Sequence, residues 1–278
     1  MTKQMEELAH AKINLSLRVL RRREDGFHEI RTLIAPITLC DSLEIRRADA
    51  FEFGCTDPTL PADEENLVVR AARLFFTETG CAPKVRIVLQ KRIPHGAGLG
   101  GGSSDAAATL RGLNKCFDAK IAHERLLEMA AKLGSDVPFF IQETTAICRG
   151  RGEIVRPVEL STRFNLLLLK PEFPVATAWA YSLSGGVRSV ADVPYQRVGR
   201  RALVNHLERP VFGKFVFLAR LKMWLLAQPE VAAALLSGSG STVFAVLRDA
   251  AVADGLAARA RAELDPNLWA CACEMLRV

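Results

Sequence analysis

The sequence has no apolar run that is long enough to cross a membrane. Its most apolar stretches, residues 164–169 and 223–227, fall far short of the roughly 18 residues that a spanning helix needs. The first residues, MTKQMEELAHAKINL, also lack the apolar core of a signal peptide and the arginine- and serine-rich character of a transit peptide. We therefore expect a cytoplasmic protein that has no membrane partner.

The sequence also lacks the cysteine spacing of a zinc site or of a disulfide framework. Seven cysteines are present, an odd number, and no two of them form a C-x-x-C pair. Cys271 and Cys273 stand in an alternating apolar run over 268–276, which favours a strand in which both thiols pack. Reduced thiols in a cytosolic protein are the simplest interpretation.

Aromatic residues are few, and they do not alternate with basic residues as they do in many RNA-binding surfaces. The net charge of +6 still fits an anionic partner, either a nucleic acid or a phosphorylated small molecule. The densest basic run, residues 21–23, is followed at once by Glu24 and Asp25, which is typical of a solvated surface. We therefore expect a small-molecule partner and no nucleic acid.

The length and patterning of the chain predict an α+β protein of one or two domains. A chain of 278 residues with 49% hydrophobic residues can form one large or two moderate domains. A weak composition break near 155–163 predicts an N-terminal domain of 1–158 and a C-terminal domain of 159–278. Strands are expected around 43–45, 85–89, 164–169, 242–247 and 268–276, and helices over 66–79, 123–133, 195–207, 214–227 and 251–264.

The strongest local signal is a glycine-rich loop over residues 94–105, PHGAGLGGGSSD. Five glycines in seven residues cost backbone entropy and offer nothing to a core, but they allow successive N–H groups to face an anion. The positive end of the following Ala-rich helix would lie behind them. Ser103 and Ser104 could cap that helix, and one hydroxyl could reach a phosphate-bound metal.

The loop is not a clean example of either common nucleotide motif. It lacks the lysine of G-x-x-x-x-G-K-[ST], and the G-x-G-x-x-G dinucleotide fingerprint is incomplete because no Asp or Glu stands at a strand end where it could bind a ribose. A flexible turn before a capped helix is the alternative to a phosphate-binding loop.

Asp136 lies in a second motif, GSDVPFF at 134–140. It follows a helix-stopping glycine and precedes a proline that favours a new helix, so an N-cap role would explain it without catalysis. The alternative is a general base that takes or aligns the proton of a substrate hydroxyl.

Two further segments each leave two interpretations open. In AKINLSL at 11–17, Lys12, Asn14 and Ser16 share one face of a predicted strand, which is either a solvated face or a functional one. In SGSGST at 237–242, the glycines and serines form either a simple hairpin or linker, or a second loop that faces an anion.

Taken together and in this order, these segments resemble the GHMP kinase superfamily. The resemblance spans nearly the whole chain, and it also includes DGFH at 25–28 and GRGE at 150–153 in its expected place. It implies a two-domain α+β fold with the active site between an ATP-binding N-terminal half and a C-terminal half. It also implies an ATP-dependent kinase, with Mg²⁺ as cofactor through ligands that the sequence does not identify.

Within the superfamily, DGFH and GSDVPFF are similar to the corresponding stretches of the enzymes that phosphorylate 4-diphosphocytidyl-2-C-methyl-D-erythritol. The resemblance therefore implies phosphorylation of its 2-hydroxyl, a step of non-mevalonate isoprenoid biosynthesis. A sister kinase of mevalonate, homoserine or a sugar is the alternative, and such kinases lack the DGFH stretch and the paired aromatic positions.

The resemblance also implies roles for single residues. Lys12 and Asp136 correspond to the catalytic pair, in which Lys12 keeps Asp136 ionised and stabilises charge on the transferred group. Phe27 and Tyr181 correspond to the residues that sandwich the cytosine ring, and His28 to the one that reads its edge. Further substrate-side residues are Asn14, Thr177, Gly238, Ser239 and Gly240. The residues expected at the ATP phosphates are Pro94, His95, Gly96, Ala97, Gly98, Leu99, Gly100, Gly101, Gly102, Ser103 and Ser104.

Three positions depart from the family pattern. Phe27 stands where Tyr is commoner, Ala176 where Ser is frequent, and His206 where Asp is usual. These departures bear on substrate binding and leave the catalytic pair intact.

Overall fold

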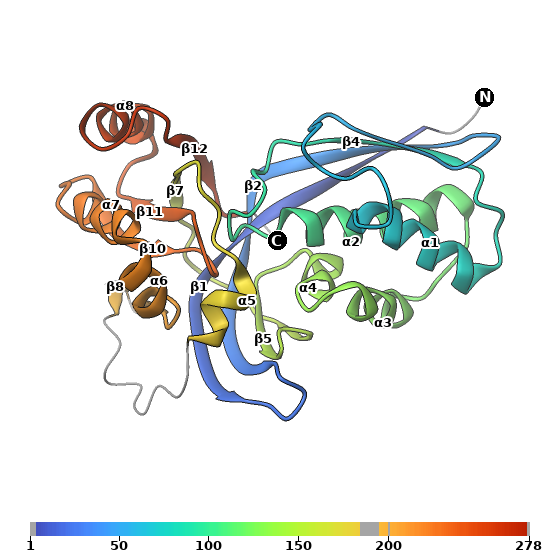
Figure 1. The fold of residues 1–278 in the computed structure, drawn as a ribbon, viewed down its shortest axis with the longest axis horizontal. Coiled ribbons are helices and arrows are strands. Elements are labelled where there is room, and N and C mark those ends of the chain that lie inside the picture. The colour runs from blue at the N-terminus through green and yellow to red at the C-terminus, as the bar shows by residue number, and fades with distance from the viewer. Residues whose placement is uncertain (1–3, 184–194, 200, 277–278) are drawn as a thin grey trace. The chain divides into compact units, whose positions relative to one another are not determined.

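The computed structural model describes residues 4–183, 195–199 and 201–276, which fall into two compact units. Two long strands, β1 (Met5–Arg22) and β2 (His28–Arg47), contribute residues to both units (Figure 1). The first unit comprises Met1–Ala11, Cys40–Pro94 and Gly100–Glu143, and the second comprises Lys12–Leu39, His95–Leu99 and Thr144–Val278.

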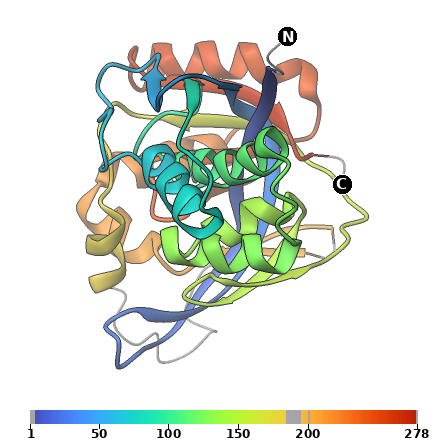
Figure 2. The same ribbon diagram turned by 90° about the vertical axis from the view of Figure 1, so that its right-hand side faces the viewer.

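In the first unit, helices pack on one face of a small group of strands (Figure 2). Strand β4 (Val85–Gln90) pairs antiparallel with the end of β2, and β3 (Glu52–Cys55) pairs parallel with β4. Helix α1 packs on α2, and α4 packs on both α2 and α3. The helices are α1 (Leu67–Thr79), α2 (Gly101–Phe117), α3 (His123–Leu133) and α4 (Val137–Gln142).

Two of these helices confirm the sequence prediction because their ends are encoded locally. The side chain of Asn66 accepts a hydrogen bond from the N–H of Val68 at the start of α1. Gly80 ends α1 with a φ of 69°, and its N–H donates to the carbonyl of Phe76. Helix α3 has the predicted bounds and ends at Gly134.

The second unit is built on a four-stranded antiparallel sheet with the order β10-β11-β7-β12. Helix α7 packs on β10 and β11, and α8 packs on β7 and β12, so that the sheet's apolar side chains are buried. These elements are β7 (Asn165–Lys170), β10 (Val231–Leu236), β11 (Val243–Leu247), β12 (Trp269–Glu274), α6 (Glu208–Lys214), α7 (Val216–Leu226) and α8 (Ala253–Glu263).

The remaining elements of the second unit are short. Strand β5 pairs with β2 and with β6, while β9 pairs with β1 and with β8. They are β5 (Ala146–Gly150), β6 (Ile154–Pro157), α5 (Thr177–Ser182), β8 (Gln196–Val198), β9 (Arg201–Asn205) and the 3-10 turn η2 (Ala250–Val252).

The prediction of a helix over 195–207 is wrong. The described residues of this segment form β8 and β9, and Ser16 on β1 lies opposite Val204 in a parallel pairing. A short apolar run such as 202–204 fits a strand as well as a helix by periodicity alone. Pairing with a strand almost 190 residues earlier in the chain decides the outcome.

Other predictions of the second half are confirmed. Cys271 and Cys273 both lie on β12, an edge strand of the four-stranded sheet. The predicted helices over 214–227 and 251–264 correspond to α7 and α8, with slightly different ends. The proposed division at residues 158–159 falls inside the second unit and stays a prediction.

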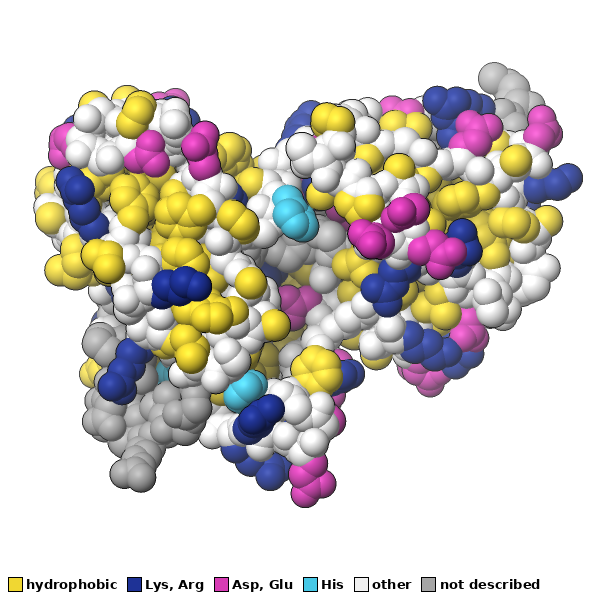
Figure 3. Space-filling model, viewed as in Figure 1, with side chains coloured by type: hydrophobic (Ala, Val, Ile, Leu, Met, Phe, Trp, Pro, Cys, Tyr) yellow, Lys and Arg dark blue, Asp and Glu magenta, His cyan; other side chains and the backbone are white. Residues whose placement is uncertain are grey.

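The surface shown in Figure 3 has two features within single units. Acidic and basic side chains are interspersed over the helices of the first unit. Hydrophobic side chains gather over α7, which carries the exposed Val216 and Met223. Among the residues that the structure describes, no helix is both long enough and apolar enough to span a membrane.

Candidate active site

The glycine loop uses backbone conformations that other residues rarely adopt. Gly96, Gly98 and Gly100 have φ values of 62°, 73° and 74°, in the left-handed region. Helix α2 starts directly after Gly100, and the N–H of Ser104 is the first to bond back, to the Gly100 carbonyl at 2.9 Å. The N–H groups of residues 101–103 thus have no acceptor within the helix, an arrangement that binds phosphate.

Two loop glycines are also required by packing, which corrects the expectation that packing plays no part. A Cβ on Gly98 would lie 2.1 Å from the carbonyl oxygen of Ser237. A Cβ on Gly101 would lie 3.0 Å from Cγ2 of Ile93 and 3.2 Å from Nζ of Lys91. These glycines therefore allow protein segments to approach one another, in addition to any ligand.

The two serines of the motif do not cap α2. The N-cap residue is Gly100, and no side chain bonds to the helix start there. Ser104 is buried inside the first turn, where its hydroxyl donates to the carbonyl of His10 at 2.7 Å. Ser103 is half-buried and remains the loop hydroxyl that could face a ligand.

A buried charge cluster lies under the start of α2 in the first unit. Lys91 donates to Asp41 and, at 2.8 Å, to Asp105, and all three side chains are almost fully buried. Asp41 also accepts the N–H of Ile93 at 2.8 Å, at the entrance to the loop. Burial, opposed by Lys91 and reinforced by Asp41, raises the pKa of Asp105 to about 8. The cluster therefore ties the segment before the loop to the helix after it.

Lys12 is buried in the second unit, which excludes a solvated strand face. Only 4% of Lys12 is exposed, and its Nζ donates to Oδ1 of Asn14 at 2.6 Å and to the carbonyl of Gly98 at 2.8 Å. Asn14, equally buried, donates in turn to Thr32 at 2.8 Å on the neighbouring strand β2. A buried ammonium requires such acceptors, so this part of β1 is built around Lys12.

The second glycine loop lies against the same lysine. A Cβ on Gly238 would lie 3.1 Å from Nζ of Lys12 and 3.4 Å from Oδ1 of Asn14. The hydroxyl of Ser237 donates to the carbonyl of Gly98 at 3.0 Å. The segment 237–242 is therefore no free linker, because it packs against both Lys12 and the first glycine loop.

The aromatic residues that were predicted to bind the substrate make two separate ring contacts. The rings of His28 and Tyr181 lie 5.8 Å apart between centroids, tilted by 32°. Phe27 is half-exposed at the turn before β2, and the guanidinium of Arg151 lies 4.7 Å from its ring centroid. Burial, reinforced by Arg22, lowers the pKa of His28, so its neutral imidazole offers one donor and one acceptor.

Thr177 and Ser239 come together from different segments. Their hydroxyls are 2.9 Å apart, with Thr177 at the first position of α5 and Ser239 in the second glycine loop. Ala176 is the N-cap residue of α5 and makes no side-chain cap bond, so the departure at this position removes a cap that serine would supply.

Asp136 lies in the first unit immediately before α4. It occupies the N-cap position, but its carboxylate makes no capping hydrogen bond, and its backbone is helical rather than extended. The N-cap interpretation therefore has no support in the structure. The carboxylate of Asp136 is half-buried.

Sequence reasoning missed several polar residues that support these segments. Lys91 and Asp41 stand outside any motif, and Asp105 closes the glycine-loop motif without an assigned role. Asn205 is fully buried and donates to the carbonyl of Gly238 at 2.7 Å. Its neighbour His206, which departs from the family pattern, instead places Nδ1 3.2 Å from the backbone N–H of Val19. Their sequence neighbours do not single them out, since Lys91, for example, is flanked by Gln90 and Arg92.

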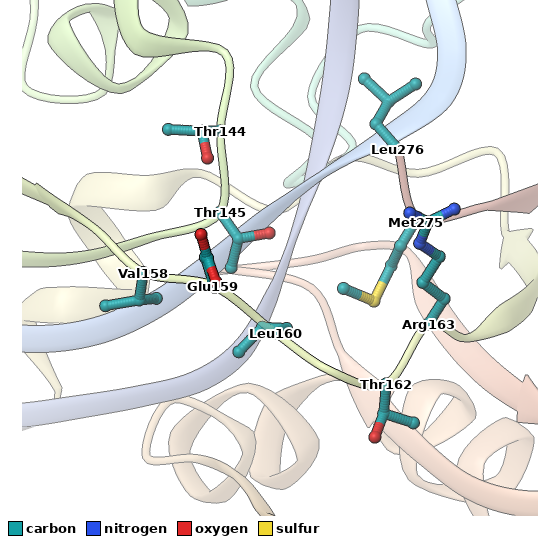
Figure 4. Close-up of a pocket in the computed structure, with 9 residues that line it drawn as sticks. All are labelled: Thr144, Thr145, Val158, Glu159, Leu160, Thr162, Arg163, Met275 and Leu276. Carbon is teal, nitrogen blue, oxygen red and sulfur yellow. The ribbon is translucent and has the colours of Figure 1, made fainter. Parts of the chain in front are cut away.

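Neither a metal cluster nor the pocket drawn in Figure 4 coincides with these residues. Within residues 4–183, 195–199 and 201–276, no group of three or more His, Cys, Asp and Glu side chains could hold a metal ion. A pocket of about 150 Å³ in the second unit contains none of the predicted site residues (Figure 4). It is lined by Thr144, Thr145, Val158, Glu159, Leu160, Thr162, Arg163, Met275 and Leu276.

Comparison with known proteins places these features in one family. Residues 66–144 match the family model described as GHMP kinases N terminal domain. The chain is 41% identical to the 4-diphosphocytidyl-2-C-methyl-D-erythritol kinase of Methylacidiphilum infernorum, covering 95% of this chain and 94% of the relative. It is 37% identical to the enzyme of that name from Gloeobacter violaceus, over 95% and 92% of the two chains.

Solved structures agree with the sequence relatives. A crystal structure of 4-(cytidine 5'-diphospho)-2C-methyl-D-erythritol kinase is 35% identical and superposes with a TM-score of 0.80, covering 98% of this chain and 100% of that one. Homoserine kinase from Cytophaga hutchinsonii is 17% identical with a TM-score of 0.68, over 99% and 95% of the chains. The second similarity concerns the fold alone.

The buried charge cluster predicts a pH-dependent stability. Because the folded-state pKa of Asp105 is raised to about 8, against about 4 in an unfolded chain, the folded protein holds an extra proton between these values. Relative to Asp105→Asn, which does not titrate, the stability of the wild type should therefore fall as pH rises towards 8, by at most about 1.4 kcal/mol per pH unit. Urea unfolding of both proteins at pH 5, 6, 7 and 8 measures this difference. A difference that stays constant with pH would show that Asp105 is ionised throughout.

Proposed function

Since the chain belongs to the 4-diphosphocytidyl-2-C-methyl-D-erythritol kinase family of GHMP kinases, we propose that it phosphorylates the 2-hydroxyl of that cytidine compound with ATP. The reaction gives the 2-phosphate and ADP, a step of non-mevalonate isoprenoid biosynthesis. The observation that carries the proposal is the identity of 41% to a kinase of this name over almost the full length of both chains.

The ATP phosphates are assigned to the glycine loop and the start of α2. The free N–H groups of residues 101–103 and the helix dipole supply positive potential there. Mg²⁺ would be held mainly by the phosphate oxygens, which suits a hard cation that keeps several of its waters. The hydroxyl of Ser103 is the loop hydroxyl that fits this role, because Ser104 is buried inside the first turn of α2 and Ser103 is only half-buried.

Asp136 and Lys12 are assigned to the transfer step. Phosphoryl transfer passes through a loose transition state, so the protein contributes mainly alignment and charge stabilisation. The carboxylate of Asp136 is not used as a helix cap, and it would accept the proton of the 2-hydroxyl. The ammonium of Lys12 is fixed by Asn14 and Gly98, and it would stabilise negative charge on the transferred group.

The cytidine end of the substrate is assigned to the aromatic residues of the second unit. Phe27 and Tyr181 would stack on the two faces of the cytosine ring, and neutral His28 would bond to its edge. The guanidinium of Arg151 lies over the face of Phe27, so the cytosine ring would have to displace this guanidinium in order to stack there. Thr177 and the second glycine loop, through Gly238, Ser239 and Gly240, would complete this side.

A sister kinase of another alcohol is the rival function. Homoserine and mevalonate kinases share the fold at 17% and 12% identity, which carries no substrate assignment. A panel of 4-diphosphocytidyl-2-C-methyl-D-erythritol, homoserine and mevalonate with ATP tests the two possibilities directly. Turnover of homoserine or mevalonate in place of the cytidine compound would refute the proposal.

Asp136→Asn should lower kcat by roughly 100-fold or more, because the amide cannot take the hydroxyl proton. The unfolding free energy should stay within about 1 kcal/mol of wild type, since no cap bond is lost. Steady-state kinetics and urea unfolding of the same preparation measure both. Full activity in Asp136→Asn would leave phosphoryl transfer to positioning alone.

Lys12→Met should bind ATP but lose a comparable fraction of kcat, because it removes the ammonium and keeps the apolar stem. In the double variant with Asp136→Asn, the loss should be far smaller than the sum of the two in free energy, as for residues that act as a unit. Additive losses would show that the two side chains act in separate steps.

Phe27→Ala or Tyr181→Ala should raise the KM of the cytidine substrate about tenfold or more, since stacking on a base is worth roughly 1–3 kcal/mol. The KM of ATP should change little. Arg151→Met is a useful companion, because it removes the guanidinium from the Phe27 ring and leaves the ring in place. If the alanine variants lost ATP affinity alone, the two ligand ends would have to be exchanged.

Gly102→Val should raise the KM of ATP more than tenfold while the protein stays folded. A Cβ at this exposed position meets only Cδ1 of Leu67, at 3.6 Å, so the fold accepts it, whereas the approach of phosphate to the backbone is obstructed. Gly255→Val is the matched control, at an exposed glycine in the first turn of α8 with open space around it. Normal ATP titration by Gly102→Val would refute the phosphate assignment.

A further inference from the structure

Three buried polar side chains form a hydrogen-bonded group at the start of the second glycine loop. Asn205 ends β9, Glu208 begins α6, and Lys222 lies on α7. At most 7% of any of the three is exposed. We call them the loop anchor, and none of them has a part in the transfer or binding roles described above.

Asn205 holds two carbonyl groups of the loop. Its amide nitrogen donates to the carbonyl of Leu236 at 2.8 Å and to that of Gly238 at 2.7 Å. Its amide oxygen accepts the N–H of Leu207 at 2.9 Å, which fixes the orientation of the amide. Both N–H donors of this side chain are thus used by carbonyl groups at the start of the loop.

Glu208 holds the N–H group of the same residue, Leu236. One carboxylate oxygen accepts that N–H at 3.0 Å, and the other accepts Nζ of Lys222 at 2.6 Å. Burial, opposed by Lys222, raises the pKa of Glu208, so the pair is kept in the interior at an energetic cost. A cost of this kind calls for a compensating role, and the contact with Leu236 indicates where that role lies.

The second glycine loop lies next to Lys12, the lysine that is assigned to the transfer step. Ser237 and Gly238 follow Leu236 directly, and a Cβ on Gly238 would lie 3.1 Å from Nζ of Lys12. Asn205 also lies opposite Leu17 in the pairing of β9 with β1, the strand that carries Lys12. The anchor therefore fixes both the loop and its distance from that strand.

We propose that Asn205 and Glu208 are positioning residues for phosphoryl transfer, which set the Ser237–Ser241 loop against Lys12. The proposal rests on the proposed function for its kinetic effect, since a displaced loop would leave Lys12 and the acceptor hydroxyl misaligned. Misplacement of a positioned group by about 1 Å can cost on the order of 100-fold in rate. Its structural part, the order of the loop, does not depend on the substrate.

Asn205→Asp is the first test. Aspartate keeps the shape and the acceptor for Leu207, but it cannot donate to the carbonyls of both Leu236 and Gly238, because it has at most one donor. We expect kcat to fall at least tenfold with the KM of ATP within twofold. Amide hydrogen exchange at Ser237 and Gly240, whose N–H groups bond within the loop, should accelerate at least tenfold.

A pair of double variants separates positioning from the loss of a buried ion pair. Glu208→Gln/Lys222→Met removes both charges but keeps a side-chain oxygen for the N–H of Leu236. Glu208→Leu/Lys222→Met removes the charges and that oxygen together. The first double variant should have a kcat and a rate of loop exchange within threefold of wild type. The second should show the same lowered kcat and the same faster loop exchange as Asn205→Asp.

A buried glutamate of the first unit provides the control. Glu7 is 6% exposed, as is Glu208, and it pairs with Lys115 and Arg111 far from the loop in sequence. Glu7→Gln should lower thermal stability without a change in exchange at Ser237 and Gly240.

Two results would overturn the proposal. One is unchanged kcat and loop exchange in Asn205→Asp, and the other is equal behaviour of the two double variants. If Asn205→Asp does not fold, the double variants alone decide. If the protein does not phosphorylate the cytidine substrate but hydrogen exchange in the variants follows the expected order, the proposed function is refuted. The structural role of the loop anchor is then still supported.

Discussion

A buried ammonium group must find hydrogen-bond acceptors, and much of the second unit is arranged to meet this requirement at Lys12. The amide oxygen of Asn14 and the carbonyl of Gly98 supply acceptors, and Thr32 orients Asn14 from the next strand. Gly238 leaves the space that the ammonium needs, because a side chain there would meet it. Three segments far apart in sequence are thereby brought to one charge.

The first unit contains a comparable arrangement at another part of the glycine loop. Lys91 is buried between Asp41 and Asp105 and lies next to Gly101, as Lys12 lies next to Gly98. Each unit therefore places a buried lysine against its own part of the loop. Such clusters contribute little net stability compared with apolar packing, so their value lies in a defined geometry for the loop.

The family relation and the geometry bear on different parts of the function. The fold is shared with homoserine and mevalonate kinases at low identity, so the fold itself does not select the substrate. In the proposed function, selection depends on side chains that a few positions supply, namely Phe27, His28 and Tyr181 in the second unit. The departure at Phe27 keeps an aromatic face, and Arg151, from another segment of the chain, places a cation over it.

The sequence by itself determined the features that neighbouring residues encode. The capped ends of α1, the bounds of α3 and the left-handed glycines of the loop follow from local chemistry at Asn66, Gly80 and Gly100. The motifs also sufficed to indicate the family, because each retains its residues and its order. Only the tertiary structure decided that 201–205 is a strand, since its partner on β1 is remote in sequence. It likewise decided that Lys12 is buried and that Asn205 holds the second loop, because burial and hydrogen-bond partners are set by segments that no local pattern brings together.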